Sequence, residues 1–117
     1  MGQPVAMFEV VSSDVERAQQ FYSTLFDWKI DVDPAMGGYG LVDTGVEGGL
    51  IGGIGGSMGP GDTGVKVYVR VDDLAAYLDR AEQLGGRRLV EPTQLPGEFG
   101  WFAVFADPDG NPVGLWA

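Results

Sequence analysis

The sequence predicts an α+β fold in which two tandem βαβββ modules form one curved mixed sheet with a concave face. Two observations support this prediction. The segment 66–85 matches the segment 7–26 without a gap, and each reads as a strand that runs into an amphipathic helix. Short β-rich segments separated by glycine and proline follow both copies. A repeat of this kind indicates a duplicated module, with both helices on the convex face of the sheet.

Strands and turns alternate in both modules, which span residues 4–56 and 64–117 and are joined by a linker at 57–63. Together they are predicted to make a single domain over 1–117, long enough to bury its own core. The run 48–56 holds six glycines but matches no nucleotide-binding pattern, and we interpret it as close backbone packing or an adaptable cavity wall. The predicted strands are 5–11, 28–32, 39–43, 50–54, 65–71, 88–91, 101–106 and 112–116, with turns or loops at 34–38, 45–49, 92–97 and 107–110.

One amphipathic helix is predicted in each module. The first starts at Ser13, which has the spacing of a capping box with Glu16. The second is capped by Asp72 or Asp73. The helices are predicted to end near Phe26 and at Gly85, and their core-facing residues are Val15, Ala18, Tyr22 and Leu25 in the first and Leu74, Tyr77, Leu78, Ala81 and Leu84 in the second.

The composition excludes several classes of chemistry. The chain of 117 residues has no cysteine, so neither a disulfide nor a thiolate metal site can form. It has no histidine, which excludes imidazole as a base, an acid or a metal ligand. Its net charge of −10 disfavours binding to nucleic acid and to anionic membranes. Because no apolar run is long enough to span a bilayer, we expect a soluble, cytoplasmic protein.

Two motifs indicate a family. Residues 13–28, with Ser-Asp-Val-Glu-Arg-Ala followed by Phe-Tyr and Leu-Phe-Asp-Trp, resemble the opening of vicinal oxygen chelate proteins, and Asp-Pro-Asp-Gly-Asn at 107–111 is similar to their closing motif. This superfamily includes glyoxalase I, bleomycin-resistance proteins and extradiol dioxygenases. The resemblance covers nearly the whole chain. It implies paired βαβββ modules around a U-shaped cavity, in a homodimer.

The resemblance also implies where a metal would bind. Metalloenzymes of this superfamily hold a divalent ion with inward side chains on four strands, mostly His and Glu. The matching positions form two pairs of repeat equivalents, Met7 with Lys66 and Gly52 with Gly114. The second pair follows from the alignment that places Tyr39 on Trp101. Glycine has no side chain, and a lysine ammonium has no lone pair to donate to a metal. Unless a carboxylate such as Glu9 ligates from a neighbouring position, we expect no metal and no other cofactor.

Strand alternation predicts which side chains line the cavity. If Met7 points inward, Glu9 does too. By the same rule, Lys66 is accompanied by Tyr68 and Arg70, Gly114 by Trp116, and Gly52 by Ile54. The opposite parity, which includes Phe8 and Val67, is apolar as a helix-covered face should be. Trp101 belongs to a C-terminal aromatic cluster that either stacks on a flat ligand or packs in the core or a dimer contact. The predicted ligand-binding residues are Met7, Glu9, Gly52, Ile54, Lys66, Tyr68, Arg70, Trp101, Gly114 and Trp116.

Glu9 with Lys66 or Arg70 is the pair best suited to chemistry. Glu9 would act as a general base or as an anchor for a polar ligand, and Tyr68 would donate a hydrogen bond to a ligand oxygen. The simpler interpretation, which we favour, is an ion pair between two inward charges. The catalytic candidates are therefore Glu9, Lys66 and Tyr68.

These observations lead to one functional hypothesis and three alternatives. We expect a homodimer that binds a small organic molecule, planar or aromatic, in its concave cavity without a metal and sequesters it. One alternative is a metal-independent isomerase, lyase or hydroxylase-like enzyme that uses Glu9 with Lys66 or Tyr68. Another is a divalent-metal-dependent lyase or dioxygenase of the same superfamily. A third is an accessory module whose cavity is filled by its own side chains. Whether modules pair within a chain or between chains stays open.

Overall fold

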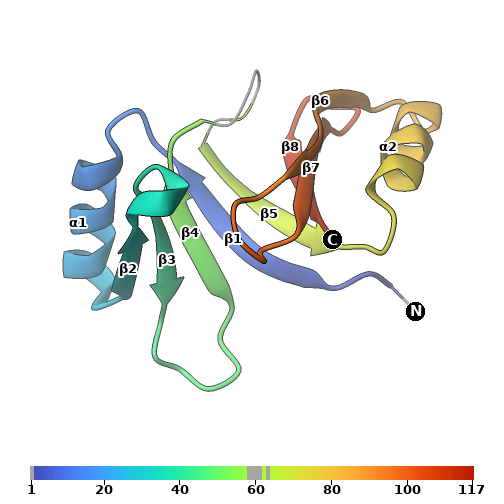
Figure 1. Cartoon of the computed structure of the whole chain (residues 1–117). Coiled ribbons are helices and arrows are strands. Elements are labelled where there is room, and N and C mark those ends of the chain that lie inside the picture. The colour runs from blue at the N-terminus through green and yellow to red at the C-terminus, as the bar shows by residue number, and fades with distance from the viewer. Residues whose placement is uncertain (1, 58–61, 63) are drawn as a thin grey trace.

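The computed structural model describes residues 2–57, 62 and 64–117, and over these residues it confirms the predicted α+β architecture (Figure 1). One curved sheet has the strand order β2-β3-β4-β1-β5-β8-β7-β6, and α1 and α2 lie at its two outer sides. Of the predicted linker at 57–63, only Ser57 and Asp62 are among the described residues. The elements are β1 (Val5–Val11), α1 (Val15–Phe26), β2 (Lys29–Asp33), the 3-10 helix η1 (Pro34–Met36), β3 (Tyr39–Asp43), β4 (Ile51–Gly55), β5 (Gly64–Arg70), α2 (Leu74–Gln83), β6 (Arg87–Gln94), β7 (Trp101–Ala106) and β8 (Pro112–Trp116).

The two modules join along β1 and β5, at the centre of the sheet. These strands are antiparallel, and Glu9 lies opposite Lys66 while Phe8 lies opposite Val67. Within each module the first strand pairs in parallel with the last, β1 with β4 and β5 with β8. The strand order on one side of the β1–β5 seam therefore repeats on the other. The modules pair within one chain, which the sequence had left open.

Both helices begin with the same cap, at equivalent positions of the repeat. The Asp14 carboxylate accepts a bond from the backbone N–H of Arg17 at 3.3 Å, and the Asp73 carboxylate accepts one from Ala76 at 3.1 Å. The predicted capping box, with Ser13 as the first residue, is wrong by one residue. Aspartate caps a helix as well as serine does, and its charge also suits the positive end of the helix dipole.

The buried face of α1 differs from the predicted apolar face. Gln19 is its buried residue, and its side-chain amide donates bonds of 3.0 Å to the carbonyls of Gly38 and Ile54. Leu25, which was expected in the core, is 59% exposed. The helix is thus held to β4 and to the segment before β3 by hydrogen bonds as well as by packing. In α2, Leu74 and Leu78 are buried as predicted, whereas Leu84 is 70% exposed because it lies past the last turn.

Strand β6 is longer than predicted. It continues through Pro92 to Gln94, where a loop was expected over 92–97. The strand is the last in the sheet, and its pairing with β7 is irregular between Arg88 and Thr93. Proline is tolerated there because an edge strand has backbone groups that need no partner in the sheet.

The two faces of the sheet carry different cores. On the concave face Met7, Tyr68, Val90, Phe102 and Val104 form one cluster of buried residues. A second cluster lies under α2 and includes Leu74, Leu78 and Leu115. Under α1 the packing is aromatic, since the ring centroid of Trp28 lies 5.4 Å from that of Phe8 and 4.9 Å from that of Phe26. None of the described helices is long and apolar enough to cross a membrane.

Candidate functional site

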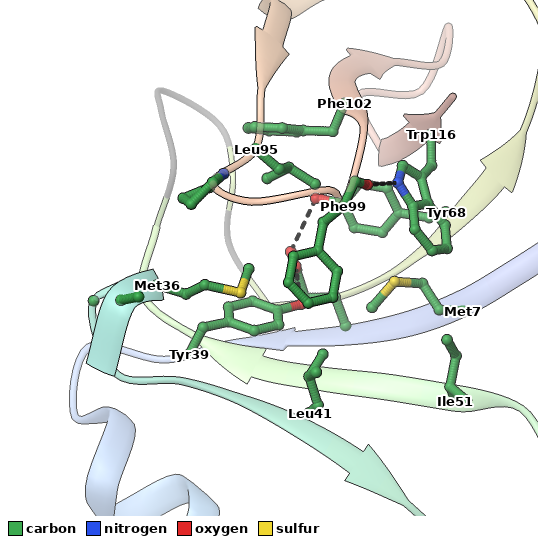
Figure 2. A pocket seen from close by; sticks show the side chains of 14 residues that line it. Met7, Met36, Tyr39, Leu41, Ile51, Tyr68, Leu95, Phe99, Phe102 and Trp116 are labelled. Carbon is green, nitrogen blue, oxygen red and sulfur yellow. Dashed lines mark hydrogen bonds between the residues drawn. The ribbon is translucent and has the colours of Figure 1, made fainter. Parts of the chain in front are cut away.

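A cavity of about 450 Å³ opens on the concave face between the two modules (Figure 2). Figure 2 shows Tyr39, Leu41 and Ile51 on one side of it and Leu95, Phe102 and Trp116 on the other. Glu9 is the only charged side chain among the described residues that line it. The lining residues are Met7, Glu9, Ala35, Met36, Gly37, Tyr39, Leu41, Ile51, Tyr68, Leu95, Pro96, Phe99, Phe102 and Trp116.

Glu9 is the centre of a buried polar cluster at the wall of this cavity. Its Oε2 accepts a bond of 2.5 Å from the Tyr39 hydroxyl, and its Oε1 accepts one of 3.2 Å from the Tyr68 hydroxyl. Lys66 is buried, with 3% of the residue exposed, and its ammonium donates to Glu9 Oε1 and to Asp62 Oδ1. Lys66, a predicted ligand-binding residue, is not among the residues that line the cavity. The predicted ion pair between Glu9 and Lys66 is confirmed, with Asp62 as a second partner.

Both tyrosine hydroxyls in this cluster stay protonated. Burial raises the pKa of Tyr39 well above its ordinary value, and the negative charge of Glu9 raises it further. The pKa of Tyr68 is raised for the same two reasons. A protonated hydroxyl is the state that donates to a carboxylate, so the two bonds and the two pKa shifts support each other. Lys66 supplies the opposite charge that a buried carboxylate needs.

Two glycines make room for the tyrosine rings. A Cβ built on Gly53 would lie 1.8 Å from the Tyr39 hydroxyl oxygen, and one built on Gly114 would lie 2.4 Å from the Tyr68 ring. In the sheet, Gly53 lies opposite Glu9 and Gly114 lies opposite Tyr68. Each tyrosine ring therefore covers a glycine in the last strand of a module, and its hydroxyl reaches Glu9.

The sequence placed the wrong face of β4 toward the cavity. A Cβ on Gly52 would lie 2.1 Å from the ring of Phe8, which points away from Glu9, so Gly52 and Ile54 face the helix side. Ile51 lines the cavity, and Gly53 points the same way. The residue of the first module that is equivalent to Gly114 is therefore Gly53. The sequence alignment had chosen its neighbour, Gly52. A shift of one residue turns every side chain of a strand to the other face.

The corrected positions do not fit the metal that the family resemblance implies. They hold Met7, Gly53, Lys66 and Gly114, and tyrosine rings fill the space beside both glycines. The Lys66 ammonium is committed to two carboxylates. Among the described residues no three His, Cys, Asp or Glu side chains come close enough together to hold a metal ion. The Met7 thioether is too soft a ligand to hold Ni²⁺, Zn²⁺ or Fe²⁺ alone.

The other predicted site residues divide into two groups. Met7, Glu9, Tyr68 and Trp116 line the cavity, and their role in ligand binding stays a prediction. Arg70 does not pair with Glu9, and its guanidinium carbon lies 4.9 Å from the ring centroid of Trp116. Trp101 is 46% exposed and lies outside the lining.

Sequence reasoning missed Tyr39 and the segment after β6. Tyr39 was read as the first residue of a strand and as the repeat equivalent of Trp101, and not as a site residue. Gly53 and Gly55 were the available signal, because an added Cβ on either would meet the Tyr39 ring and a strand interior gives little other reason for glycine. Close packing was one of the two interpretations of that glycine run. Leu95, Pro96 and Phe99 come from a predicted loop and the residues just after it, and the carbonyl of Phe99 accepts a bond of 2.6 Å from the Trp116 indole. A long-range contact of this kind leaves no mark in the local pattern.

Comparison with known proteins places these features in a family context. A model described as a glyoxalase-like domain matches residues 7–116. The chain is 33% identical over 128 residues to anthracycline biosynthesis protein DnrV of Streptomyces peucetius, a match that covers 95% of this chain and 46% of that protein. It is 32% identical over 123 residues to a glyoxylase-like domain-containing protein of Didymella fabae, covering 92% of this chain and 88% of that protein.

The relatives differ in length from this chain. It is 31% identical to putative glyoxylase CFP32 of Mycobacterium bovis and of Mycobacterium tuberculosis and spans 43% of each. It spans 46% of the protein from Streptomyces peucetius. A solved glyoxalase/bleomycin resistance protein/dioxygenase superfamily member from Vibrio splendidus aligns with a TM-score of 0.61 and 16% identity over 97% of both chains. That similarity establishes the shared fold.

Proposed function

The chain belongs to the glyoxalase-like domain family of the vicinal oxygen chelate superfamily, and from this premise we propose that it binds a small, flat organic molecule without a metal ion and sequesters it. The main support is the cavity itself, whose walls are apolar or aromatic apart from the cluster around Glu9. Pockets with apolar walls and a few convergent polar groups are typical of small-molecule sites. The rings of Tyr39 and Tyr68, which take the space beside Gly53 and Gly114, support metal-free binding.

The flat shape of the ligand follows from the side chains that would contact it. Aromatic rings line the cavity on both sides, with Tyr39 on one side and Phe102 and Trp116 on the other (Figure 2). Such rings favour stacked or edge-on contacts with another ring. The relative from Streptomyces peucetius carries a name from anthracycline biosynthesis, and anthracyclines are fused-ring molecules, which agrees with this proposal.

Filling the cavity tests the proposal. Ile51 lines the cavity and is half exposed, so Ile51→Trp places an indole in the binding space without removing a core residue. Leu50→Trp is the matched control, because Leu50 is the neighbouring residue, is almost equally exposed and does not line the cavity. With naphthalene as the probe, titration calorimetry should give similar affinities for the wild type and Leu50→Trp. Ile51→Trp should bind at least ~10-fold more weakly, the equivalent of a loss of ~1.4 kcal/mol. Equal binding by all three proteins would remove the cavity as the site.

A metal analysis tests the second part of the proposal. Protein purified from its native host should contain no stoichiometric Ni, Zn or Fe by elemental analysis. Added Ni²⁺, Zn²⁺ or Fe²⁺ should leave both the melting temperature and the affinity for naphthalene unchanged. One metal ion per chain, bound through the described residues around Glu9, would contradict metal-free binding.

A metal-independent enzyme is the second candidate function, and one observation favours it. Glu9 lines the cavity as a carboxylate held by the Lys66 ammonium, so it could take a proton from a bound substrate. Tyr68 would then orient Glu9, since its proton is already donated to that carboxylate. The two functions differ in the fate of the ligand. A sequestered compound is recovered unchanged by mass spectrometry, whereas an enzyme incorporates deuterium from D₂O or releases a product, and Glu9→Gln abolishes that change.

The homodimer also belongs to this proposal. An exposed apolar strip runs along the outer face of β5, where Val65 is 68% exposed and Val67, which lies opposite Phe8, is 39% exposed. A second copy would cover this strip, as exposed apolar patches commonly mark contact surfaces. Sedimentation at micromolar concentration should give twice the mass of one chain, and a single-chain mass would contradict the dimer.

A further inference from the structure

The hydrogen bonds of Glu9 leave one acceptor position open. A carboxylate offers about four lone-pair positions, two on each oxygen. Oε1 accepts from Lys66 and from Tyr68, which fills both of its positions. Oε2 accepts from Tyr39, and among the described residues no other donor reaches it. Because Glu9 lines the cavity, a bound molecule with one hydrogen-bond donor can occupy the remaining acceptor position of Oε2.

The charges around the cavity oppose an anionic ligand. Glu9 and Asp62, both buried, share the ammonium of Lys66, so the cation at this site already faces two carboxylates. No cationic side chain is among the described residues that line the cavity, and Arg70 stacks outside it on Trp116. A ligand carboxylate would therefore lie near Glu9 in an apolar environment, where like charges repel strongly. The net charge of −10 adds a weaker repulsion at longer range.

We propose that the cavity selects a fused-ring compound that is uncharged or cationic and that presents a hydroxyl or amino donor to Glu9 Oε2, and that it rejects carboxylated analogues. This inference rests on the proposed binding function and specifies its ligand class. The aromatic walls and the thioethers of Met7 and Met36 contact the ring system, since sulfur–aromatic contacts are favourable. The tyrosine hydroxyls set the orientation of Glu9, because each holds one of its oxygens.

A matched series of probes tests the selection. Naphthalene, 2-naphthol, 2-naphthylamine and 2-naphthoate share one ring system and differ in a single substituent. Their affinities for the wild-type protein are measured by titration calorimetry at neutral pH and constant ionic strength. We expect 2-naphthol and 2-naphthylamine to bind roughly 10-fold or more tightly than naphthalene, as expected for a hydrogen bond to a charged acceptor. The anionic 2-naphthoate should bind at least ~10-fold more weakly than naphthalene, because burying an unpaired charge is costly.

Two variants assign the selection to Glu9. Glu9→Gln keeps the size of the side chain but removes its charge, so the preference for 2-naphthol over 2-naphthoate should shrink at least ~10-fold. Tyr39→Phe keeps the charge and leaves Oε2 with two open positions, so the preference for 2-naphthol should persist. If Glu9→Gln does not fold, the ranking in the wild type and in Tyr39→Phe still decides the question.

The outcomes separate this inference from the proposed function. Binding of naphthalene with equal or tighter binding of 2-naphthoate overturns the inference and leaves the cavity as a binding site. An unchanged preference for 2-naphthol in Glu9→Gln also overturns it, because the donor would then bind elsewhere. A series in which no member binds, naphthalene included, overturns the proposed function together with the inference.

Discussion

Replacing Gly53 by alanine probes the arrangement on which the site depends. The new Cβ would lie 1.8 Å from the Tyr39 hydroxyl oxygen and 2.3 Å from the ring carbon that bears it. Normal contacts of this kind start near 3.4 Å, so the ring must move by more than 1 Å. Because Gly53 lies opposite Glu9 in the β1–β4 pair, the backbone on that side is held by the sheet and the tyrosine has to move.

The expected cost combines two effects. An extra methyl in a packed site costs about 1–3 kcal/mol. Loss of the 2.5 Å bond from Tyr39 to the Glu9 carboxylate removes a hydrogen bond to a charged acceptor, worth about 1.5–3 kcal/mol. These contributions overlap, because one movement of the ring causes both. We therefore expect Gly53→Ala to lower the free energy of unfolding by ~2–5 kcal/mol.

Urea denaturation measures this difference against a matched glycine. In Gly56→Ala the new Cβ meets Val15 at 3.8 Å, an ordinary contact, so the free energy of unfolding should change by less than ~0.5 kcal/mol. Gly53→Ala should also weaken the binding of 2-naphthol, since the displaced ring enters the cavity. Equal stability of the two alanine variants would show that Tyr39 does not lie over Gly53, and the geometry of the site would have to be revised.

Two further predictions concern charge and pH. Lys66→Met leaves Glu9 and Asp62 buried without their shared cation and should destabilise the protein by about 3–5 kcal/mol in urea denaturation. Arg88→Met should have little effect, because the acidic partners of Arg88 are exposed. Similar losses of stability in both variants would refute the buried ion pair. Because burial raises the pKa of Tyr39 and Tyr68 in the folded state, their contribution to stability is complete below the unfolded pKa and is lost as the pH rises above it. The free energy of unfolding should thus fall above pH ~10 by up to ~1.4 kcal/mol per pH unit for each tyrosine, and a slope unchanged in Tyr39→Phe would refute this assignment.

The sequence alone determined the fold and the orientation of the two central strands. The repeat that aligns Met7 with Lys66 runs through β1 and β5 without a gap, so the alternation within each strand correctly turned Met7, Glu9, Lys66 and Tyr68 to one face. Parity inside a strand is a local property. The residue types at positions 7, 66 and 114 also showed, without a structure, that these positions lack the histidine or carboxylate side chains that hold a metal in the family. The pairing of Glu9 with Lys66 followed from two inward charges on strands of the same repeat.

Only the tertiary structure decided how the remaining strands face the cavity and what completes the site. The segment between β1 and β4 differs in length from the segment between β5 and β8, so the position of Gly53 cannot be counted along the chain from that of Gly114. The register of Gly53 is set by hydrogen bonding with β1. Tyr39 lies 30 residues from Glu9 in the sequence and reaches it across the fold from the start of a strand. Such contacts depend on the packing of segments that are distant in sequence, and a register shift of one residue reverses a face. The physical limit on prediction here is therefore strand register, which local sequence does not encode.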